Sequence, residues 1–379
     1  MKSNYNQLGQ YIEMVSRTNS DLKYGIEDVR GCSNTKQMMQ TRANLIGRTY
    51  EKFIVLRPQE FVFNRRTTRN GEKIGMAYNN TDREYIFTND YVAFRVKQEY
   101  LDKLLPDYLY MFFCRDEFDR YARYKSTGSA TEFFNWEDMC AVPFEIPPMD
   151  FQQLVVNAYK VLNERIETKQ KINDNLINTT DTIFFKVFLE NKPTATISFT
   201  DIVQLMGGGT PKTDEDSFWN GNILFFTPKD ISRSPFCIST EKHLTNEGLN
   251  NCSSRLYPPY TTFVTCRGTV GNLALAGVPM AMNQSCYALK GKNDFPALFV
   301  FSFTRYVIAT MKKKASGAVF SALVTRDFEM EKVFEPNFED AILFEKRVEP
   351  LFAQILANTN EIQQLLDLQN ALLTQLSSR

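Results

Sequence analysis

The stretch GGGTPKTDEDSFWNGNILFFTPKDI, from Gly207 to Ile231, concentrates turn-forming residues around one short apolar strand. Three glycines and a proline lead into an acidic run, and a second Thr-Pro pair closes the segment. Glycine and proline are the strongest local signals for turns, because they widen or restrict the allowed backbone angles. The stretch therefore predicts a strand between two shaped loops, as in a globule of mixed α and β structure.

The bulk composition limits the protein classes that fit this chain. Its 379 residues predict two domains, and its 44 basic and 44 acidic residues leave no net charge. Any surface for nucleic acid must therefore be a local one. The N-terminus lacks the apolar stretch of a signal peptide, and the most apolar later segment is too short to cross a bilayer, so no membrane contact is expected.

Few residues in the chain are suited to catalysis. The seven cysteines show no CxxC spacing and predict reduced thiols in a cytoplasmic protein, and His243 is the sole histidine. A catalytic triad or a histidine-ligated metal site would have to use that one residue. The glycine run after Met206 lacks the lysine of a nucleotide-binding loop. We therefore predict that the chain is not an enzyme and binds no cofactor or metal itself.

Two long segments of the chain resemble each other. YKSTGSATEFFNWEDMCAVPFEIPP begins at Tyr124, and KKKASGAVFSALVTRDFEMEKVFEP begins at Lys312. Each has basic residues, a Ser/Thr-Gly turn, an apolar strand, an acidic turn and a strand that ends in proline. Upstream, FVFNRRTTRNGEKIGMA from Phe61 resembles TFVTCRGTVGNLALA from Thr262. Repetition over such a long period predicts two similar halves.

A long helix is predicted after the final proline of each half. The second helix has a strict 4-3 spacing that is typical of a coiled coil, through Val348, Phe352, Ile355, Thr359, Ile362, Leu366, Gln369, Leu373 and Leu376. The first helix has a weaker stripe, of Val155, Tyr159, Leu162, Ile166, Leu176 and Ile183 with polar Lys169, Asn173 and Thr180 between them. The alternative is a core helix within each globule.

These patterns together predict an α+β fold of two mixed α/β globules. Two long helices would separate the globules and pair as an antiparallel coiled coil with pseudo-two-fold symmetry. The predicted boundaries are 1–147 for the first globule, 148–192 for the central helix, 193–336 for the second globule and 337–379 for the C-terminal helix.

Basic and small polar residues recur on the predicted loops of both halves. Such side chains donate hydrogen bonds to phosphates and base edges, so we predict that they contact duplex DNA. A solvated surface charge is the alternative for each residue alone. The candidate contacts are Arg65, Arg66, Arg69, Lys73, Arg123, Lys125, Ser126 and Ser129 in the first half, and Thr210, Lys212, Thr227, Lys229, Arg267, Lys312, Lys313, Lys314 and Ser316 in the second.

The opening stretch resembles the start of a target-recognition domain in the specificity subunit of Type I restriction-modification enzymes. The strand-Arg-Gly-x-x-Gly stretch from Phe263, the MNQS turn at Met282 and SGAVFSALVTRDFE from Ser316 are similar to later elements of that family. The first half resembles another subtype, through DLKYGIEDVRGCS from Asp21 and YIFTNDYVAF from Tyr85. It lacks the GGTP opening, and the second half has Glu335-Pro336 where the family has Pro-Pro.

This resemblance implies a DNA reader without catalytic function. Each globule would recognise one half of a bipartite sequence, and the helices would set the spacer and dock methylation subunits. S-adenosylmethionine, ATP and Mg would be bound by partner methylation and restriction subunits. Trp219 and Pro228 would hold the fold rather than contact DNA. The alternative function is a coiled-coil adaptor whose globules bind protein.

Overall fold

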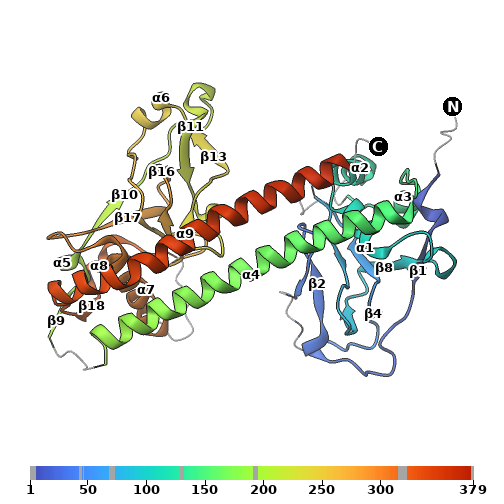
Figure 1. The fold of residues 1–379 in the computed structure, drawn as a ribbon, viewed down its shortest axis with the longest axis horizontal. Coiled ribbons are helices and arrows are strands. Elements are labelled where there is room, and N and C mark those ends of the chain that lie inside the picture. Colours follow the sequence, from blue (N-terminus) through green and yellow to red (C-terminus); the bar gives the residue numbers. More distant parts are fainter. Residues whose placement is uncertain are drawn as a thin grey trace. The chain divides into compact units, whose positions relative to one another are not determined.

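The computed structural model describes residues 6–41, 45, 47–67, 73–128, 132–190, 195–314 and 322–376 (Figure 1). The chain forms two compact units. The first unit combines Met1–Glu164 with Leu366–Arg379, and the second comprises Arg165–Leu365. The first unit is therefore built from two segments that lie far apart in the sequence.

The first unit contains an antiparallel sheet of four strands in the order β1-β8-β5-β6. Its strands are β1 (Ile12–Val15), β8 (Tyr91–Val96), β5 (Phe61–Asn64) and β6 (Met76–Tyr78). Two smaller strand pairs join it, formed by β2 (Arg30–Cys32) with β3 (Met38–Gln40), and β4 (Ile54–Leu56) with β7 (Tyr85–Phe87). Phe61 of β5 and Phe94 of β8 are fully buried and pack on Phe113 of helix α1 (Pro106–Phe113). Helices α2 (Asp116–Lys125) and α3 (Trp136–Cys140) follow.

The second unit is built on a five-stranded sheet in the order β10-β17-β14-β15-β12. Its strands are β10 (Val203–Gly207), β17 (Cys286–Gly291), β14 (Thr262–Thr265), β15 (Leu273–Ala276) and β12 (Phe236–Cys237). A three-stranded sheet contains β13 (Lys242–Leu244), β11 (Trp219–Phe226) and β16 (Met280–Met282), and β11 is the strand expected from the opening stretch. Strands β9 (Thr196–Ser198) and β18 (Lys332–Phe334) form a further pair.

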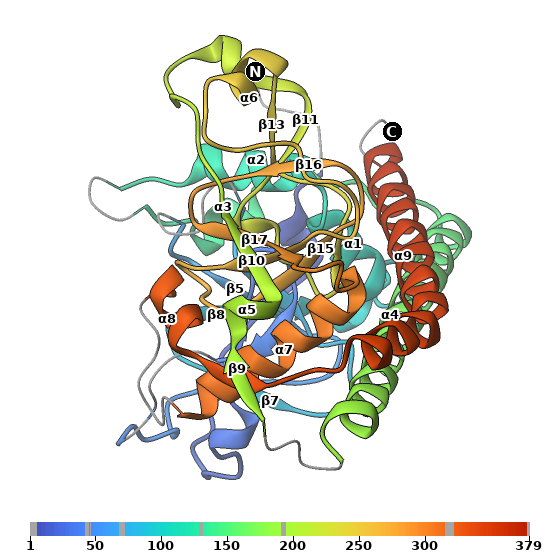
Figure 2. The ribbon, with the colours of Figure 1, turned by 90° about the vertical axis from the view of Figure 1, so that its left-hand side faces the viewer.

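Three helices of the second unit meet beside its larger sheet (Figure 2). They are α5 (Phe199–Ile202), α7 (Ala297–Lys314) and α8 (Thr325–Met330), and a short helix α6 (Asn246–Asn250) lies elsewhere in this unit. The Phe199 ring is 5.7 Å from that of Phe303 and 5.5 Å from that of Phe328, measured between centroids. All three rings are fully buried, which closes this part of the core.

The two long predicted helices are present as α4 (Met149–Phe188) and α9 (Phe338–Gln375). Within the second unit, Arg165 of α4 pairs with Glu361 of α9, while Asn173 bonds to Asn358. The later residue of α4 contacts the earlier residue of α9, so the two helices run antiparallel within this unit. The predicted fold class, mixed α/β globules with long helices, is confirmed. The interlocking of side chains expected for a coiled coil stays a prediction, as do the domain boundaries.

One position in the predicted stripe of α9 is wrong. Leu366 is 39% exposed, whereas its neighbour Leu365 is only 7% exposed. The inward-facing residues after Ile362 are therefore Leu365 and then Gln369, a spacing of three and then four. A helix of 3.6 residues per turn accommodates either order, and the packing of the neighbouring helix decides between them.

Among the described helices, none is both long enough and apolar enough to cross a bilayer.

Candidate nucleic-acid interface

The turn Met282–Ser285 brings together three loops of the second unit that carry predicted DNA contacts. Backbone hydrogen bonds join the turn to Gly209 (3.2 Å), to Phe226 (3.0 Å) and to Cys266 (2.7 Å). These three residues precede Thr210, Thr227 and Arg267 in the chain, respectively. The sequence motifs GGT, FTPKD and CRG, distant from one another in the chain, thus lie around one turn.

The glycines of the first loop are required by this close approach. A Cβ atom on Gly208 would lie 2.2 Å from the backbone oxygen of Asn283, and one on Gly209 would lie 2.6 Å from the backbone nitrogen of Ser253. Both distances are too short for a side chain, and the opposing atoms belong to the backbone. The glycine run therefore serves backbone packing and not a phosphate cradle.

The hydroxyl groups of the two predicted threonines already have partners within the unit. Thr210 donates to the side-chain oxygen of Gln284, and Thr227 donates to Asp230 at 2.8 Å. The backbone nitrogen of Thr227 donates to the same Asp230 carboxylate at 2.7 Å. As DNA contacts these threonines stay predictions, and a hydroxyl donating to DNA would first have to release its present acceptor.

Lys212 and Lys229, the predicted lysine contacts that precede and follow β11 in the chain, are both exposed. Lys212 offers its backbone oxygen to the indole nitrogen of Trp219 at 3.0 Å, and the indole also packs edge-on against Phe225. This is the fold-holding role expected for the tryptophan. Lys229 lies 3.8 Å from a carboxylate oxygen of Glu241, and its side chain is 78% exposed.

Arg267 begins the loop between β14 and β15 and is exposed. It forms no hydrogen bond or ion pair with any other residue in the described ranges. Gly268 and Gly271 of the same loop have φ angles of 78° and 74°, a region that favours glycine. Unlike the hydroxyl groups of Thr210 and Thr227, the Arg267 guanidinium would not have to break an existing hydrogen bond in order to bind DNA.

The three consecutive lysines at the end of α7 differ in their contacts with the rest of the unit. Lys312 donates to the backbone oxygen of Gly271 at 3.1 Å, and Lys314 pairs with Glu331. Lys313 is exposed and has no ion pair with another described residue. The three ammonium groups are therefore not equivalent.

Lys313→Ala should weaken binding to all duplexes alike. If Lys313 contacts one phosphate, the change should flatten the slope of log affinity against log salt by about 0.9. Lys312→Ala and Lys314→Ala should change the slope less, since these ammonium groups already have protein partners. The measurement is duplex binding across a salt series, with the exposed Lys332→Ala as control. An altered base preference with an unchanged slope would contradict this role.

In the first unit, the predicted arginines gather where three segments meet. Isolated bridges join Phe133 to Arg66 and to Thr127. The guanidinium of Arg65 lies over the Phe133 ring at 5.7 Å and donates to Asn135 at 3.3 Å. Residues 61–67, the end of α2 and residues 132–135 thus form one surface that carries most of the predicted contacts of this half.

Acidic residues neutralise much of this surface. Ion pairs join Arg66 to Asp90 (3.7 Å), Lys73 to Asp116 (3.6 Å) and Arg123 to Glu132. A phosphate would have to replace these carboxylates. The hydroxyl of Ser126 donates to the backbone oxygen of Ala122 at 2.7 Å.

Lys125 and its neighbour Tyr124 stand out from the rest of this surface. The Lys125 ammonium has no carboxylate partner among the described residues and lies near the rings of Tyr121 (5.9 Å) and Tyr124 (5.8 Å). Tyr124 is 82% exposed, an unusual setting for a large aromatic side chain. Tyr124 was not among the residues predicted from the sequence to contact DNA, and its exposure beside Lys125 is visible only in the structure. The predicted contacts Arg69, Ser129 and Ser316 lie outside the described residues.

A buried ion pair supports the first unit beneath this surface. Lys36 and Asp119 are 3% and 5% exposed, and their charged groups are in direct contact. The Asp119 carboxylate also accepts the backbone N–H of Ile74 at 3.0 Å, and the Lys36 ammonium donates to the backbone oxygen of Ile74 at 2.9 Å. Burial lowers the pKa of Lys36, and the neighbouring carboxylate opposes this shift. The pair fixes the backbone next to Lys73.

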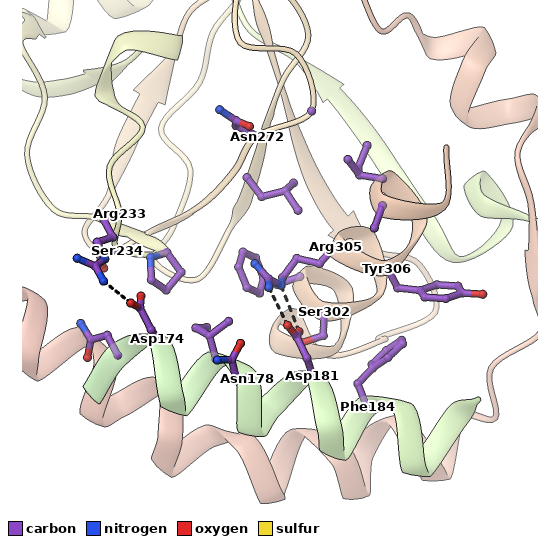
Figure 3. A pocket seen from close by; sticks show the side chains of 18 of the residues that line it. Asp174, Asn178, Asp181, Phe184, Arg233, Ser234, Asn272, Ser302, Arg305 and Tyr306 are labelled. Carbon is purple, nitrogen blue, oxygen red and sulfur yellow. Dashed lines mark hydrogen bonds and ion pairs between the residues drawn. The ribbon is translucent and has the colours of Figure 1, made fainter. Parts of the chain in front are cut away.

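A groove of about 980 Å³ lies between α4 and the rest of the second unit. Two ion pairs mark it in Figure 3: Arg233 with Asp174, and Arg305 with Asp181. Arg233 lies in the loop after Lys229, a predicted DNA contact, but its guanidinium is bound to α4. Ser302, on the wall of the groove, is 2% exposed, and its hydroxyl has no hydrogen-bond partner among the residues that the structure describes.

Burial disfavours the reactive thiolate form of several cysteines. Burial raises the pKa of Cys32, Cys237 and Cys266 to about 12 and that of Cys114 to about 11. Thiols of this kind are protonated near neutral pH and are poor nucleophiles. Within the described ranges, no group of three or more His, Cys, Asp and Glu side chains is arranged to hold a metal ion.

The sequence of this chain is similar to those of known DNA specificity proteins. Residues 191–366 match the family model described as the Type I restriction modification DNA specificity domain. A stretch of 127 residues is 28% identical to the MjaIX specificity subunit of Methanocaldococcus jannaschii, covering 32% of this chain and 29% of that protein. Another of 186 residues is 25% identical to the HindI specificity subunit of Haemophilus influenzae, covering 47% and 40%. These alignments span less than half of either relative.

The fold is also similar to that of a solved protein. The crystal structure of the Type-I restriction-modification system S subunit from M. genitalium superposes with a TM-score of 0.51 at 14% identity, covering 98% of this chain and 96% of that one. The fold is thus that of a protein with two globules and long helices. Residues 191–366 are thus similar to the DNA specificity domain of Type I restriction-modification enzymes, the family that the sequence resembles.

Proposed function

We propose that this chain is the DNA-recognition subunit of a Type I restriction-modification enzyme, and that each globule reads one half of a bipartite target. The observation that carries the proposal is the gathering of the GGT, FTPKD and CRG loops around the Met282–Ser285 turn. This cluster lies inside the region that matches the DNA specificity domain. Rigid loops with exposed basic residues are suited to contacts with phosphates and base edges.

The proposal assigns catalysis to other subunits. Methylation subunits would bind S-adenosylmethionine and dock on α4 and α9, and a restriction subunit would use ATP and Mg. The names of the relatives support an assembly of this kind, since each is the specificity subunit of a restriction enzyme. Such an assembly would act on DNA in the cytoplasm. The chain itself would contribute recognition and the spacing between half-sites.

Exchange of one globule is the direct test. Replacing residues 1–147 by the corresponding globule of another specificity subunit should change one half of the recognised sequence and leave the other half intact. The measurement is the mapping of methylated adenines in DNA exposed to the chimera together with its methylation partner. The unexchanged chain is the control.

Two results would count against the proposal. A chimera that alters both half-sites would mean that the globules form one reading surface. A chain that binds duplex DNA with no dependence on sequence or salt would favour the adaptor function instead.

A further inference from the structure

The segment Thr227–Ser234, here called the recognition segment, begins in the proposed DNA-reading loop. Its first turn is rigid: Asp230 accepts the backbone N–H of Thr227 at 2.7 Å and that of Glu241 at 2.9 Å. The Thr227 hydroxyl caps the same turn by accepting the backbone N–H of Lys229 at 3.3 Å. Only Ile231 and Ser232 separate this fixed turn from Arg233.

The other end of the recognition segment is bound to both long helices. Arg233 donates to the side-chain oxygen of Gln170 at 3.0 Å and forms an ion pair with Asp174, both on α4. The hydroxyl of the next residue, Ser234, lies 2.6 Å from that of Thr359 on α9. Three side chains from two helices thus hold two consecutive residues of the segment.

The C-terminal end of the recognition segment is not closely packed against α4 over its whole length. Arg233, Ser234 and Ile231 line the groove, which separates the segment from part of the α4 surface (Figure 3). Farther along α4, Phe184 and Phe188 are buried in the core of the unit. Tight apolar packing therefore anchors one stretch of α4, while polar contacts hold the recognition segment beside the groove.

We propose that Arg233 is a positioning residue that ties the recognition segment to α4 and so orients the loop at Thr227–Asp230. The inference rests on the proposed function, since the loop must read DNA for its orientation to matter. Arg233 would then affect recognition of the second half-site without contacting DNA. Because α4 is also the proposed docking element for methylation subunits, this contact would connect assembly with reading.

The expected effect is moderate because the ion pair is partly open to solvent. The side chains of Arg233 and Asp174 are 55% and 43% exposed. Arg233→Ala should lower the preference for the correct second half-site by about two- to fivefold, the range that a partly exposed ion pair supports. Arg233→Asp should have a larger effect, because it places like charges together. The double variant Arg233→Asp with Asp174→Arg should recover most of the loss.

The chain offers a matched control in the second ion pair along the groove. Arg305 forms a bidentate ion pair with Asp181 of α4, with N···O distances of 2.8 and 3.3 Å. Arg305 belongs to α7 and not to the recognition segment. Arg305→Ala removes a link of the same chemistry between the same helix and the same unit. It should leave the preference at the second half-site unchanged.

The experiment selects duplexes from a library with the full chain and its methylation partner, randomising one half-site at a time. The expected result is a loss confined to the second half-site in the Arg233 single variants, with recovery on charge exchange. An Arg233→Ala chain that keeps wild-type selectivity would overturn the inference, as would an equal effect of Arg305→Ala. If the wild-type chain selects no sequence at all, the proposed function itself fails.

Discussion

Replacement of Asp119 by Ala should lower the free energy of unfolding of the first compact unit by about 3–5 kcal/mol, the usual cost of breaking a buried ion pair from one side. The substitution leaves Lys36 without its counter-ion in a site where it is 3% exposed, and it removes the acceptor of the Ile74 backbone N–H. Denaturant unfolding of the full chain measures the loss. We also expect weaker reading of the first half-site, because Ile74 adjoins Lys73.

A surface variant of the same helix provides the control. Asp116→Ala breaks the Lys73–Asp116 pair, whose side chains are 53% and 72% exposed, and should cost less than about 1 kcal/mol. The double variant Lys36→Met with Asp119→Leu should recover much of the stability, since an apolar pair can replace a buried ion pair. Equal losses of unfolding free energy for Asp119→Ala and Asp116→Ala would show that the buried pair stabilises the unit no more than the exposed one.

The second large effect is expected from lengthening both helices. One heptad inserted after Glu164 in α4, and one after Leu365 in α9, would add about 10.5 Å at 1.5 Å per residue. If the helices set the spacer, the unread DNA between the half-sites should grow by roughly 3 base pairs at about 3.4 Å each. The half-site sequences should stay the same. Binding should weaken, because three base pairs rotate one half-site by about 100° relative to the other.

The assay for this prediction is methylation of a library with fixed half-sites and variable spacers. An insertion in α4 alone is the control, since it removes the matching of inward-facing residues and should reduce activity on every spacer. A folded double-insertion variant that still prefers the original spacer would contradict a role of the helices in setting the distance.

Local patterns in the sequence predicted the helices and loops well. The α4 stripe contains no exposed residue, and even its polar members Asn173 and Thr180 are buried, at 4% and 1% exposure. Periodicity reports which side of a helix is covered, and turn residues report where strands end. The strand within the Gly207–Ile231 stretch was predictable for the same reason.

Contacts between residues far apart in the chain were not predictable in this way. Lys36 and Asp119 are separated by 83 positions, and each alone reads as a solvated charge. For Arg233, no local pattern reveals that its guanidinium reaches α4. Gln284 was part of the recognised MNQS turn, yet its bond to Thr210 depends on how two loops meet. Such partners are decided by tertiary packing, which a one-dimensional pattern does not contain.

The two-segment construction of the first unit has a consequence for synthesis on the ribosome. Its core includes Leu373, and the guanidinium of Arg115 donates to the backbone oxygen of Leu376 at 3.1 Å. At about 5–20 residues per second, Leu366 is made roughly 10–40 s after Glu164. Residues 165–365, which form the second unit without a break, are all translated in that interval. Until then, the nascent first globule exposes the apolar surface that Leu373 and its neighbours cover in the finished protein.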